Sequence, residues 1–372
     1  MKKKLNFIFL FSTPSMTAHA AQPFSLACEL HRRGHGVLVA NDGKRKGDFA
    51  SRIEDAGLPR LTGLVLSTKS GPHEALGDAV KLKEVIAREK PDVSVSSYTH
   101  DHVLAAIAKS TGKTPRVVRF FNSPEPRLDP LSKLVLGRTD AFFFFSRRYR
   151  DNFARALESC AGRLHYLPGP ADTGAFCPGP GGLSFREAFG LTDRHLVFGM
   201  VLPPHGRESQ EAVLSAFATV ARKHPAARFM LIGRAEAQKE IETAASGLGV
   251  RDRVVVTGLS TTDLTDAYRA MDVFVQLEEG HDNSCRAVVE AMATAVPVVV
   301  AERGALAEIV SDGTEGRVVP EKAAATDLAA VLGEMASDPA RRREMGDAGR
   351  REAVASHSLP EVTDLFLTTV AT

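Results

Sequence analysis

The stretch that decides the fold is residues 272–300, DVFVQLEEGHDNSCRAVVEAMATAVPVVV. Its apolar runs predict a buried strand over Val273–Leu277 and a second buried strand that begins at Pro297. An acidic, polar loop and then a helix fill the space between the two strands. This strand–loop–helix–strand order is the repeating unit of a parallel sheet, so the stretch predicts an α/β protein.

Two acids in this stretch stand eight residues apart, Asp282 just before the predicted helix and Glu290 two turns inside it. The free N–H groups near Ser284, Cys285 and Arg286 form the positive end of that helix, where phosphate binds readily. Two acids on either side of an anion site suit a molecule with hydroxyls at both ends and phosphate in the middle. A nucleotide-sugar has that layout.

The segment DNSCRAVVEAMA (282–293) resembles the donor site of retaining glycosyltransferases of family 4, whose usual pattern is E-x7-E followed by A-M-A-x-G-x-P-V-V. The resemblance implies that Glu290 accepts hydrogen bonds from the ribose of the donor, which charge strengthens. It also implies that Asp282, in place of the family's first Glu, holds the hydroxyls of the transferred sugar. Ser284, Cys285 and Arg286 would then present backbone N–H groups to the diphosphate.

Simpler interpretations of the same residues stay open. The two acids can be solvated side chains of an ordinary loop and helix, and Asp282 can be a helix N-cap. Arg286 can point to solvent instead of the ligand. A nucleophilic role for Cys285 is disfavoured because nothing nearby in sequence looks like its base, and a small buried thiol explains it better.

The chain has 372 residues, which is a length for two domains that each bury a core. The 47 basic and 45 acidic residues nearly balance, so the composition suggests no nucleic-acid partner. A sequence pI of 8.3 allows weak attraction to an anionic surface. The four cysteines form no CxxC pair, which argues against a zinc cluster and favours a reducing, cytoplasmic setting.

The N-terminus allows two interpretations. Lys2–Lys4, an apolar run over Leu5–Phe11 and the triplet Ala18–Ala20 have the order of a secretory signal and its cleavage site. The same residues also predict a buried strand over Leu5–Phe11, a turn, and a helix over Gln22–Arg33. We favour the strand because the apolar run is short for a signal core and the fold needs it. Cleavage would instead favour a secreted sugar-binding protein.

Apolar runs alternate with amphipathic stretches along the whole chain, which is the pattern of βα units. The predicted strands of the first half are 5–11, 36–41, 93–97, 116–121, 141–145 and 165–167. Those of the second half are 196–201, 228–232, 253–257, 273–277, 296–301 and 316–319. The predicted fold class is therefore α/β, with two doubly wound, Rossmann-like parallel-sheet domains. The resemblance makes this the GT-B fold, whose interdomain cleft would be the ligand site.

We predict an acceptor-side domain over 1–170, a linker over 171–183, a nucleotide-sugar-binding domain over 184–355, and a last segment over 356–372. The Pro-Gly runs at 168–170 and 178–182 mark the linker. In the family, a final helix such as the one predicted over 359–370 crosses back to the first domain. Three further segments resemble the family in the same order along the chain: YLPGPADTGAFCP (166–178), HPAARFMLIGR (224–234) and GALAEIVSDGTEGRVVP (304–320).

The second half departs from the family pattern after its first strand. There the family carries an Arg and, five residues later, a Lys that neutralise the diphosphate leaving group. Pro203 and Glu208 occupy those places here, which weakens an electrostatic term that is often the largest in such a transfer. His205 and Arg207 stand nearby, and Arg207 is the candidate that can replace the missing phosphate contact.

The first half departs as well. Where the family often has a His at a strand end, this chain has Asn122, which can hydrogen-bond a sugar hydroxyl but cannot shuttle a proton. We expect His100, His102 and Arg119 at strand ends on the same edge of the cleft, and we assign them to the acceptor side. A His-x-His spacing also occurs in metal sites, but on a loop it is weak evidence for one.

The resemblance implies a cytoplasmic, retaining hexosyltransferase that needs neither cofactor nor metal. It would move a hexose from a nucleotide-sugar, with a mild preference for UDP, to a cell-envelope glycolipid or polysaccharide. One alternative is a degenerate GT-B protein that binds nucleotide or sugar without turnover, and another is a GT-B epimerase or phosphorylase. Basic runs at 44–46 and 147–148 would allow peripheral contact with the inner face of a membrane.

Overall fold

The structure is a computed structural model that describes residues 4–109, 115–121, 129–202, 207–233, 238–258, 264–279 and 285–371. The chain divides into two compact units. The first comprises residues 1–168 together with 359–372, and the second comprises residues 169–358. Each unit contains one six-stranded sheet, and all the predicted strands form within a few residues of their predicted bounds.

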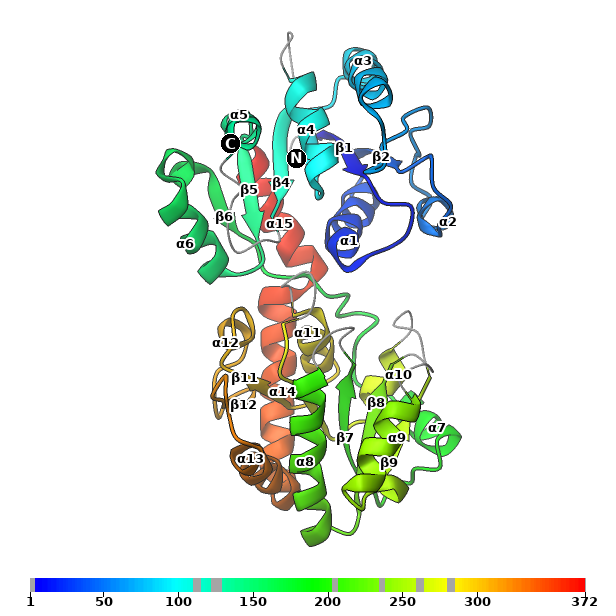
Figure 1. The fold of residues 1–372 in the computed structure, drawn as a ribbon, viewed down its shortest axis with the longest axis vertical. Coiled ribbons are helices and arrows are strands. Elements are labelled where there is room, and N and C mark those ends of the chain that lie inside the picture. The colour runs from blue at the N-terminus through cyan, green and yellow to red at the C-terminus, as the bar shows by residue number, and fades with distance from the viewer. Residues whose placement is uncertain are drawn as a thin grey trace. The chain divides into compact units, whose positions relative to one another are not determined.

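The sheet of the first unit is parallel and has the order β2-β1-β3-β4-β5-β6 (Figure 1). Its strands are β1 (Asn6–Phe11), β2 (Gly36–Asn41), β3 (Val93–Ser96), β4 (Arg116–Phe120), β5 (Ala141–Phe144) and β6 (Leu164–Tyr166). In β1, Phe9 pairs with Val39 on one side and with Val95 on the other. The apolar run near the N-terminus is therefore an interior strand of the sheet.

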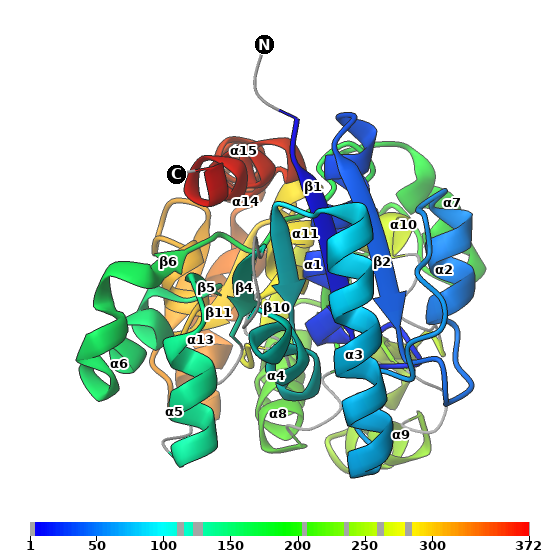
Figure 2. The same ribbon diagram turned by 90° about the horizontal axis from the view of Figure 1, so that it is seen from above.

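Helices cover both faces of this sheet because successive side chains of a strand point to opposite faces. Phe7, Phe9 and Phe11 pack against one set of helices, whereas Ile8 and Leu10 pack against the other. The first set is α1 (Ala18–Arg32), α2 (Phe49–Asp55) and α15 (Leu359–Ala371). The second set includes α3 (Pro72–Glu89) and α4 (Thr99–Ala108), which lie side by side in Figure 2. Near β5 and β6 lie α5 (Pro130–Gly137), α6 (Arg147–Ala156) and a short 3₁₀ helix over Glu158–Arg163.

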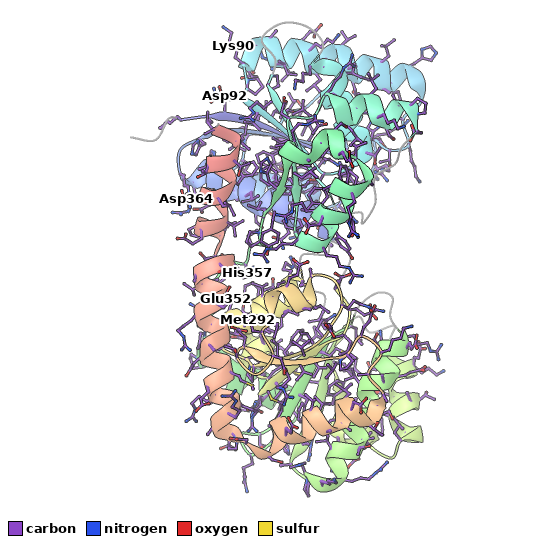
Figure 3. All side chains as sticks on the ribbon, turned by 90° about the vertical axis from the view of Figure 1, so that its left-hand side faces the viewer. Lys90, Asp92, Met292, Glu352, His357 and Asp364 are labelled. Atoms are coloured by element: carbon purple, nitrogen blue, oxygen red, sulfur yellow. The ribbon has the colours of Figure 1, made fainter. Side chains whose placement is uncertain are left out.

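The last helix, α15, is part of the core of the first unit. The ring of Phe366 lies 6.1 Å from that of Phe7, 6.0 Å from Phe120 and 5.1 Å from Phe143, measured between centroids. Asp364, labelled in Figure 3, forms an ion pair with Arg33 of the first unit at 3.2 Å. The C-terminal helix is thus packed on the first sheet, although it follows the entire second unit in sequence.

The sheet of the second unit is also parallel and has the order β12-β11-β10-β7-β8-β9. Its strands are β7 (Leu196–Val201), β8 (Ala227–Ile232), β9 (Val254–Val256), β10 (Val273–Gln276), β11 (Val298–Ala301) and β12 (Gly316–Val319). The strand order reverses beside β7, which is the switch point of a doubly wound sheet.

Helices again cover both faces of the second sheet. One face packs against α8 (Arg207–Lys223), α9 (Gln238–Gly247) and α13 (Ala325–Ser337). The other packs against α10 (Thr265–Arg269), α11 (Arg286–Ala293), α12 (Leu306–Ile309) and α14 (Pro339–His357). A helix α7 (Gly181–Ala188) contacts α10, and a 3₁₀ turn over Arg251–Arg253 precedes β9. Met292 of α11 is labelled beside α14 in Figure 3, and α11 and α14 contact each other closely.

The segment 171–183, which the sequence predicts to be a linker, belongs to the second unit. Arginines hold it there: Arg350 donates to the carbonyl oxygens of Thr173 and Phe176 at 2.9 and 2.8 Å, and Arg269 donates to that of Cys177 at 2.7 Å. A Pro-Gly composition predicts turns, but it does not show which side-chain donors will bind the carbonyl groups of those turns.

Among the described residues, the structure contains no helix with the length and apolar character required to cross a membrane.

Candidate functional site

A pocket of about 480 Å³ lies in the first unit, at the carboxyl ends of β3 and β4. Ligands of open parallel sheets bind at this edge. The polar residues that line the pocket are His19, Ser97, Tyr98, Thr99, His102, Arg119, Asp129 and Ser132. The apolar residues that line it are Val103, Phe121, Leu131, Val135 and Leu136.

Arg119 is the charged centre of this pocket. It stands near the end of β4 and is only 7% exposed. Its Nη1 lies 3.5 Å from Oδ1 of Asp101, which makes an ion pair too long for a strong hydrogen bond. Within the part of the chain that the structure describes, the buried Nε and Nη1 of Arg119 have no hydrogen-bond partner. Burial lowers the pKa of Arg119 to about 10, a value at which the guanidinium still carries its charge at neutral pH.

Asp101 caps the first turn of α4. Its carboxylate accepts hydrogen bonds from the backbone N–H groups of Tyr98 and His102 at 2.8 Å and of Ser97 at 3.4 Å. The side chain is completely buried. Burial raises the pKa of Asp101 to about 7, and the nearby Arg119 charge and the N–H donors only partly offset that rise.

The two histidines of α4 lie in different surroundings. His102 lines the pocket, and its Nε2 is 2.7 Å from the hydroxyl of Thr139. Because that hydroxyl donates to the carbonyl of Val135 at 2.9 Å, Nε2 of His102 must carry the proton and donate. Burial lowers the pKa of His102 well below its ordinary value, so the ring is neutral.

His100, which we expected on the same edge, is not among the residues that line the pocket. Burial lowers its pKa, and the charges that oppose this shift come from Asp78 and Asp42. The expectation treated residues 100–102 as a strand end, whereas they form the first turn of a helix. Residues two apart on a helix point about 200° apart, so His100 and His102 face different directions.

In the second unit, Glu290 lies on α11 at the carboxyl end of β10. Cys285 has a left-handed backbone with φ of 51°, and α11 begins at the next residue, Arg286. Glu290 therefore lies about one turn inside the helix, and the expected two turns are wrong. Its side chain is buried and accepts a hydrogen bond from the hydroxyl of Tyr268 at 3.1 Å. Arg286 reaches the same carboxylate, with Nε 3.4 Å from Oε1.

Tyr268, the partner of Glu290, can only donate its hydroxyl proton in this hydrogen bond. Tyr268 lies on α10 and is fully buried, and its ring packs near that of Phe176. Burial and the Glu290 charge raise the pKa of Tyr268 well above its ordinary value, so its hydroxyl keeps the proton. Cys285 is only 3% exposed and packs in the apolar cluster of this face, in the place expected for a small buried thiol.

Arg207 is the first residue of α8, and its side chain is 74% exposed. It forms ion pairs with Glu211 and Glu240, both at 3.0 Å. Glu208 follows it in the first turn of the same helix. The other predicted site residues of the two units, Asn122, Pro203, His205, Asp282 and Ser284, lie outside the described residues.

A polar network at the carboxyl edge of the second sheet was missed by the sequence analysis. The carboxylate of Glu278, after β10, accepts hydrogen bonds from Ser209 of α8 and from Arg303, after β11. Arg303 also pairs with Glu321 at 3.1 Å. The carboxylate of Glu279 accepts the backbone N–H of Ala305 at 2.6 Å. An acidic pair at one strand end and an arginine at the next were the only signals of this network in the sequence.

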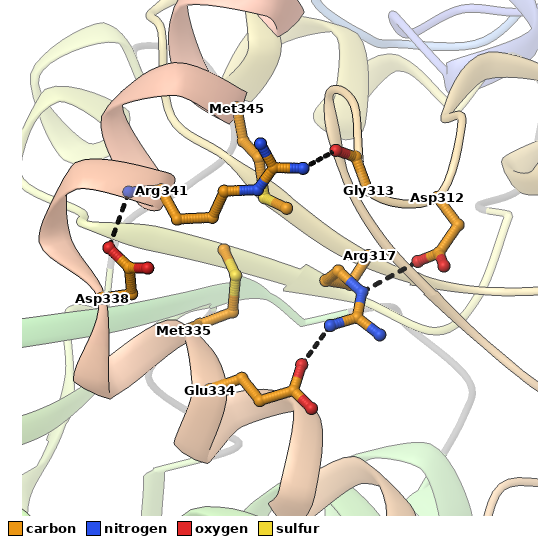
Figure 4. Close-up of a pocket in the computed structure, with 8 residues that line it drawn as sticks. All are labelled: Asp312, Gly313, Arg317, Glu334, Met335, Asp338, Arg341 and Met345. Atoms are coloured by element: carbon orange, nitrogen blue, oxygen red, sulfur yellow. Dashed lines mark hydrogen bonds and ion pairs between the residues drawn. The ribbon is translucent and has the colours of Figure 1, made fainter.

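A pocket of about 290 Å³ in the second unit has different chemistry (Figure 4). There Arg317 pairs with Asp312 at 2.9 Å and with Glu334. Arg341 donates to the carbonyl of Gly313. Because these charged groups already pair with one another at the surface, we do not assign a charged ligand to this pocket. Within the described ranges, no group of three or more His, Cys, Asp or Glu residues is placed to hold a metal ion.

Family models match both units of the chain. The model described as Glycosyltransferase Family 4 matches residues 23–175, and the model described as Glycosyl transferases group 1 matches residues 186–352.

Curated relatives match a little over half of the chain. A GDP-mannose-dependent alpha-(1-6)-phosphatidylinositol monomannoside mannosyltransferase of Mycolicibacterium smegmatis is 32% identical over 242 residues, which are 60% of this chain and 61% of that protein. The alpha-D-kanosaminyltransferase of Streptomyces kanamyceticus is 25% identical over 249 residues, which are 63% of this chain and 62% of that protein. The chain thus spans about three fifths of the length of these relatives.

Solved structures match nearly the full length. A glycosyltransferase from Rickettsia africae superimposes with a TM-score of 0.84 at 13% identity, covering 99% of this chain and 98% of that one. Anabaena Alr3699/HepE in complex with UDP and glucose gives 0.79 at 18% identity, covering 99% and 100%. These superpositions show a common fold, which is the GT-B fold. The two family models, which match residues 23–175 and 186–352, show that the chain belongs to family 4 of the glycosyltransferases.

Proposed function

We propose that this protein is a retaining glycosyltransferase that moves a hexose from a nucleotide-sugar to a glycolipid or polysaccharide of the cell envelope. The observation that carries the proposal is the buried carboxylate of Glu290, one turn inside α11 at the carboxyl edge of the second sheet. Two relatives support the acceptor class by their names, which refer to phosphatidylinositol monomannoside and to the lipopolysaccharide core.

Glu290 is suited to bind the ribose of the donor. Its carboxylate accepts a hydrogen bond from Tyr268 and lies 3.4 Å from Nε of Arg286, and the hydroxyls of a ribose would add to these contacts or replace them. Because Tyr268 stays protonated, it fixes the orientation of the carboxylate before the donor arrives. The backbone N–H groups of the first turn of α11 would face the diphosphate, as those of helix N-termini do for phosphate. Asp282 would hold the sugar hydroxyls, as the family resemblance implies.

The identity of the donor belongs to the proposal as well. The sequence analysis preferred UDP, and the Anabaena structure holds UDP with glucose. The Mycolicibacterium relative is named as GDP-mannose-dependent, so its name supports guanine and mannose instead. We therefore propose a nucleoside diphosphate hexose, with GDP-mannose and UDP-glucose as the two donors to compare. The proposed transfer takes place in the cytoplasm, with peripheral membrane contact, and uses no metal or cofactor.

A second candidate is a protein that binds nucleotide without turnover. Two cations at the carboxyl edge of the second sheet are already paired with acids: Arg207 with Glu211 and Glu240, and Arg303 with Glu278 and Glu321. A paired cation stabilises a departing diphosphate less than a free one does. Arg207 is exposed enough to exchange its partners for phosphate, and that exchange is what the catalytic proposal requires.

The test compares Glu290→Gln with Glu344→Gln, which changes an exposed acid of α14 that pairs with Arg341. We expect Glu290→Gln to weaken binding of the correct nucleotide about 10- to 100-fold, because a hydrogen bond to a charged group contributes roughly 1.5–3 kcal/mol. Calorimetric titration with GDP, UDP and their hexose conjugates measures this, and release of nucleotide diphosphate measures turnover. Unchanged binding and transfer in Glu290→Gln would contradict the proposal. Binding without transfer or hydrolysis would favour the second candidate.

A further inference from the structure

The pocket of the first unit contains two buried polar side chains with donor atoms that lack an acceptor among the described residues. Nε and Nη1 of Arg119 and the hydroxyl of Ser97 have no hydrogen-bond partner among the residues that the structure describes. Both residues line the pocket, and both are more than nine-tenths buried, at 7% and 4% exposure. A buried donor without an acceptor costs about 1–3 kcal/mol, and more when it is charged. Such groups in a pocket indicate a missing acceptor.

The acid nearest to Arg119 does not supply that acceptor. Asp101 lies 3.5 Å from Nη1, and its carboxylate already accepts three backbone N–H bonds in the first turn of α4. Asp129, the other acid of the lining, accepts both the backbone N–H and the hydroxyl of Ser132. The positive charge of Arg119 is therefore only partly compensated by the described residues.

The remaining lining also favours an anion over a neutral group. His102 donates from Nε2 to Thr139 and is neutral, so it adds no charge to a lining whose charged side chains are Arg119 and Asp129. The guanidinium lies over the aromatic ring of Phe121, with Cζ 5.7 Å from the ring centroid. A planar guanidinium with free N–H groups matches the geometry of oxyanions, above all phosphate and carboxylate.

We propose that this pocket is an oxyanion subsite, which binds a phosphate group through Arg119 and Ser97. The inference rests on the proposed function in one respect. It assigns the bound phosphate to the acceptor of the transfer, so the acceptor is a phosphate ester. Two kinds of acceptor would present the same phosphate group to this pocket: a phospholipid through its headgroup, and a soluble sugar phosphate. The apolar wall that includes Leu131, which is 57% exposed, and Val135 accommodates an apolar portion of such an ester.

The first arm of the test is calorimetric titration of the full chain with inorganic phosphate, followed by Arg119→Gln. We expect wild-type binding and at least about a tenfold loss in the variant, the range of a lost charge-assisted hydrogen bond. The matched control is Arg116→Gln on the same strand, whose guanidinium donates to the carbonyl of Val370 on the sheet side away from the pocket edge. No phosphate binding by the wild type, or equal binding by Arg119→Gln, overturns the proposal.

A measurement on the wild type guards against a variant that fails to fold. The Nε–H signal of Arg119, observed by NMR after labelling with ¹⁵N and assigned through Arg119→Lys, should shift as phosphate is added. The corresponding signal of Arg116 should stay in place. A stationary Arg119 signal at saturating phosphate overturns the proposal without any reference to variant stability.

The second arm distinguishes the two sources of phosphate. Vesicles of phosphatidylglycerol are compared with vesicles of phosphatidylcholine in sedimentation. Arg119-dependent binding to phosphatidylglycerol assigns the subsite to a lipid headgroup, whereas Arg119-dependent binding to inorganic phosphate alone assigns it to a soluble ester. Nucleotide binding that depends on Glu290, together with transfer to a neutral acceptor that phosphate does not inhibit, would sustain the proposed function and refute this subsite.

Discussion

Arg119 and Arg303 both lie at the carboxyl edge of a parallel sheet, yet they are held in opposite ways. Arg303 is 36% exposed and forms ion pairs with Glu278 and Glu321. The side chain of Arg119 is 9% exposed, and its nearest acid stands 3.5 Å away. The charge of Arg303 is therefore satisfied within the fold, whereas the hydrogen-bonding capacity of Arg119 is available to a ligand.

The difference shows how to separate structural from ligand-binding arginines in one molecule. A structural arginine has its donors filled by nearby carboxylates or carbonyls, as Arg317 and Arg350 also do. A ligand-binding arginine keeps buried donors open at a cost in stability, and it gains its acceptor only on binding. The predictions below test this contrast from the largest expected effect to the smallest.

The largest effect is expected from removal of the acid beside Arg119. Asp101→Ala should lower the stability of the first unit by about 3–5 kcal/mol, because it removes the acid nearest to the buried charge of Arg119 and the cap of α4. Glu321→Ala, which removes an exposed partner of Arg303, should cost less than about 1 kcal/mol. Hydrogen exchange of the amides of β3 and β4 measures the first variant, and that of β11 and β12 the second. Equal losses would contradict the contrast.

A smaller effect is expected at the network of the second sheet. Gly304 has a left-handed φ of 47°, and a Cβ there would lie 1.6 Å from Oε1 of Glu279. Gly304→Ala should displace the Glu279 carboxylate from the N–H of Ala305 and cost about 2 kcal/mol in the free energy of unfolding. Gly190→Ala is the control, since Gly190 has φ of 70° and open space around it. Urea unfolding that shows the same loss in both variants would mean that the Glu279 contact contributes nothing.

The third prediction concerns pH. Burial raises the pKa of Asp101 from its ordinary 3.8 to about 7, so between these values the folded protein keeps a proton that the unfolded chain releases. Stability from this group is therefore present at low pH and is lost as pH rises through about 7. Arg119 and Tyr98 are the ionisable groups whose charges interact with it.

The measurement is the free energy of unfolding of the wild type minus that of Asp101→Asn, which cannot ionise. We expect this difference to fall by about 1.4 kcal/mol per pH unit between about pH 5 and pH 7 and to level off above that range. A flat difference would show that Asp101 is ionised throughout, and the charge of Arg119 would then be better compensated than its geometry indicates.

The strands were predictable because a strand buried on both faces is a nearly continuous apolar run, as in Val298–Ala301. Arg119 was identified from its place at the end of such a run. That Nε and Nη1 of Arg119 lack hydrogen-bond partners among the described residues was not predictable, since this depends on the Asp101 carboxylate accepting the N–H groups of the first turn of α4.

Other parts of the site depend on pairings that a linear pattern does not record. Tyr268 lies 22 residues before Glu290 and reaches it only because α10 and α11 pack together. The error at His100 arose from secondary structure, because a residue spacing of two means the same side on a strand but different sides on a helix. The start of α11 depends on the left-handed backbone at Cys285, a conformation that is uncommon for a residue other than glycine.

The position of α15 has a consequence for biosynthesis. As the ribosome releases the chain from its N-terminus, the second unit, a continuous segment, emerges completely before α15 does. Until then, the sheet face that carries Phe7, Phe120 and Phe143 lacks the Phe366 ring that covers it. The first unit to be synthesised is thus the last to be completed. Its exposed aromatic face is a natural binding site for a chaperone during translation, and a nascent chain stalled before residue 359 would be prone to aggregate.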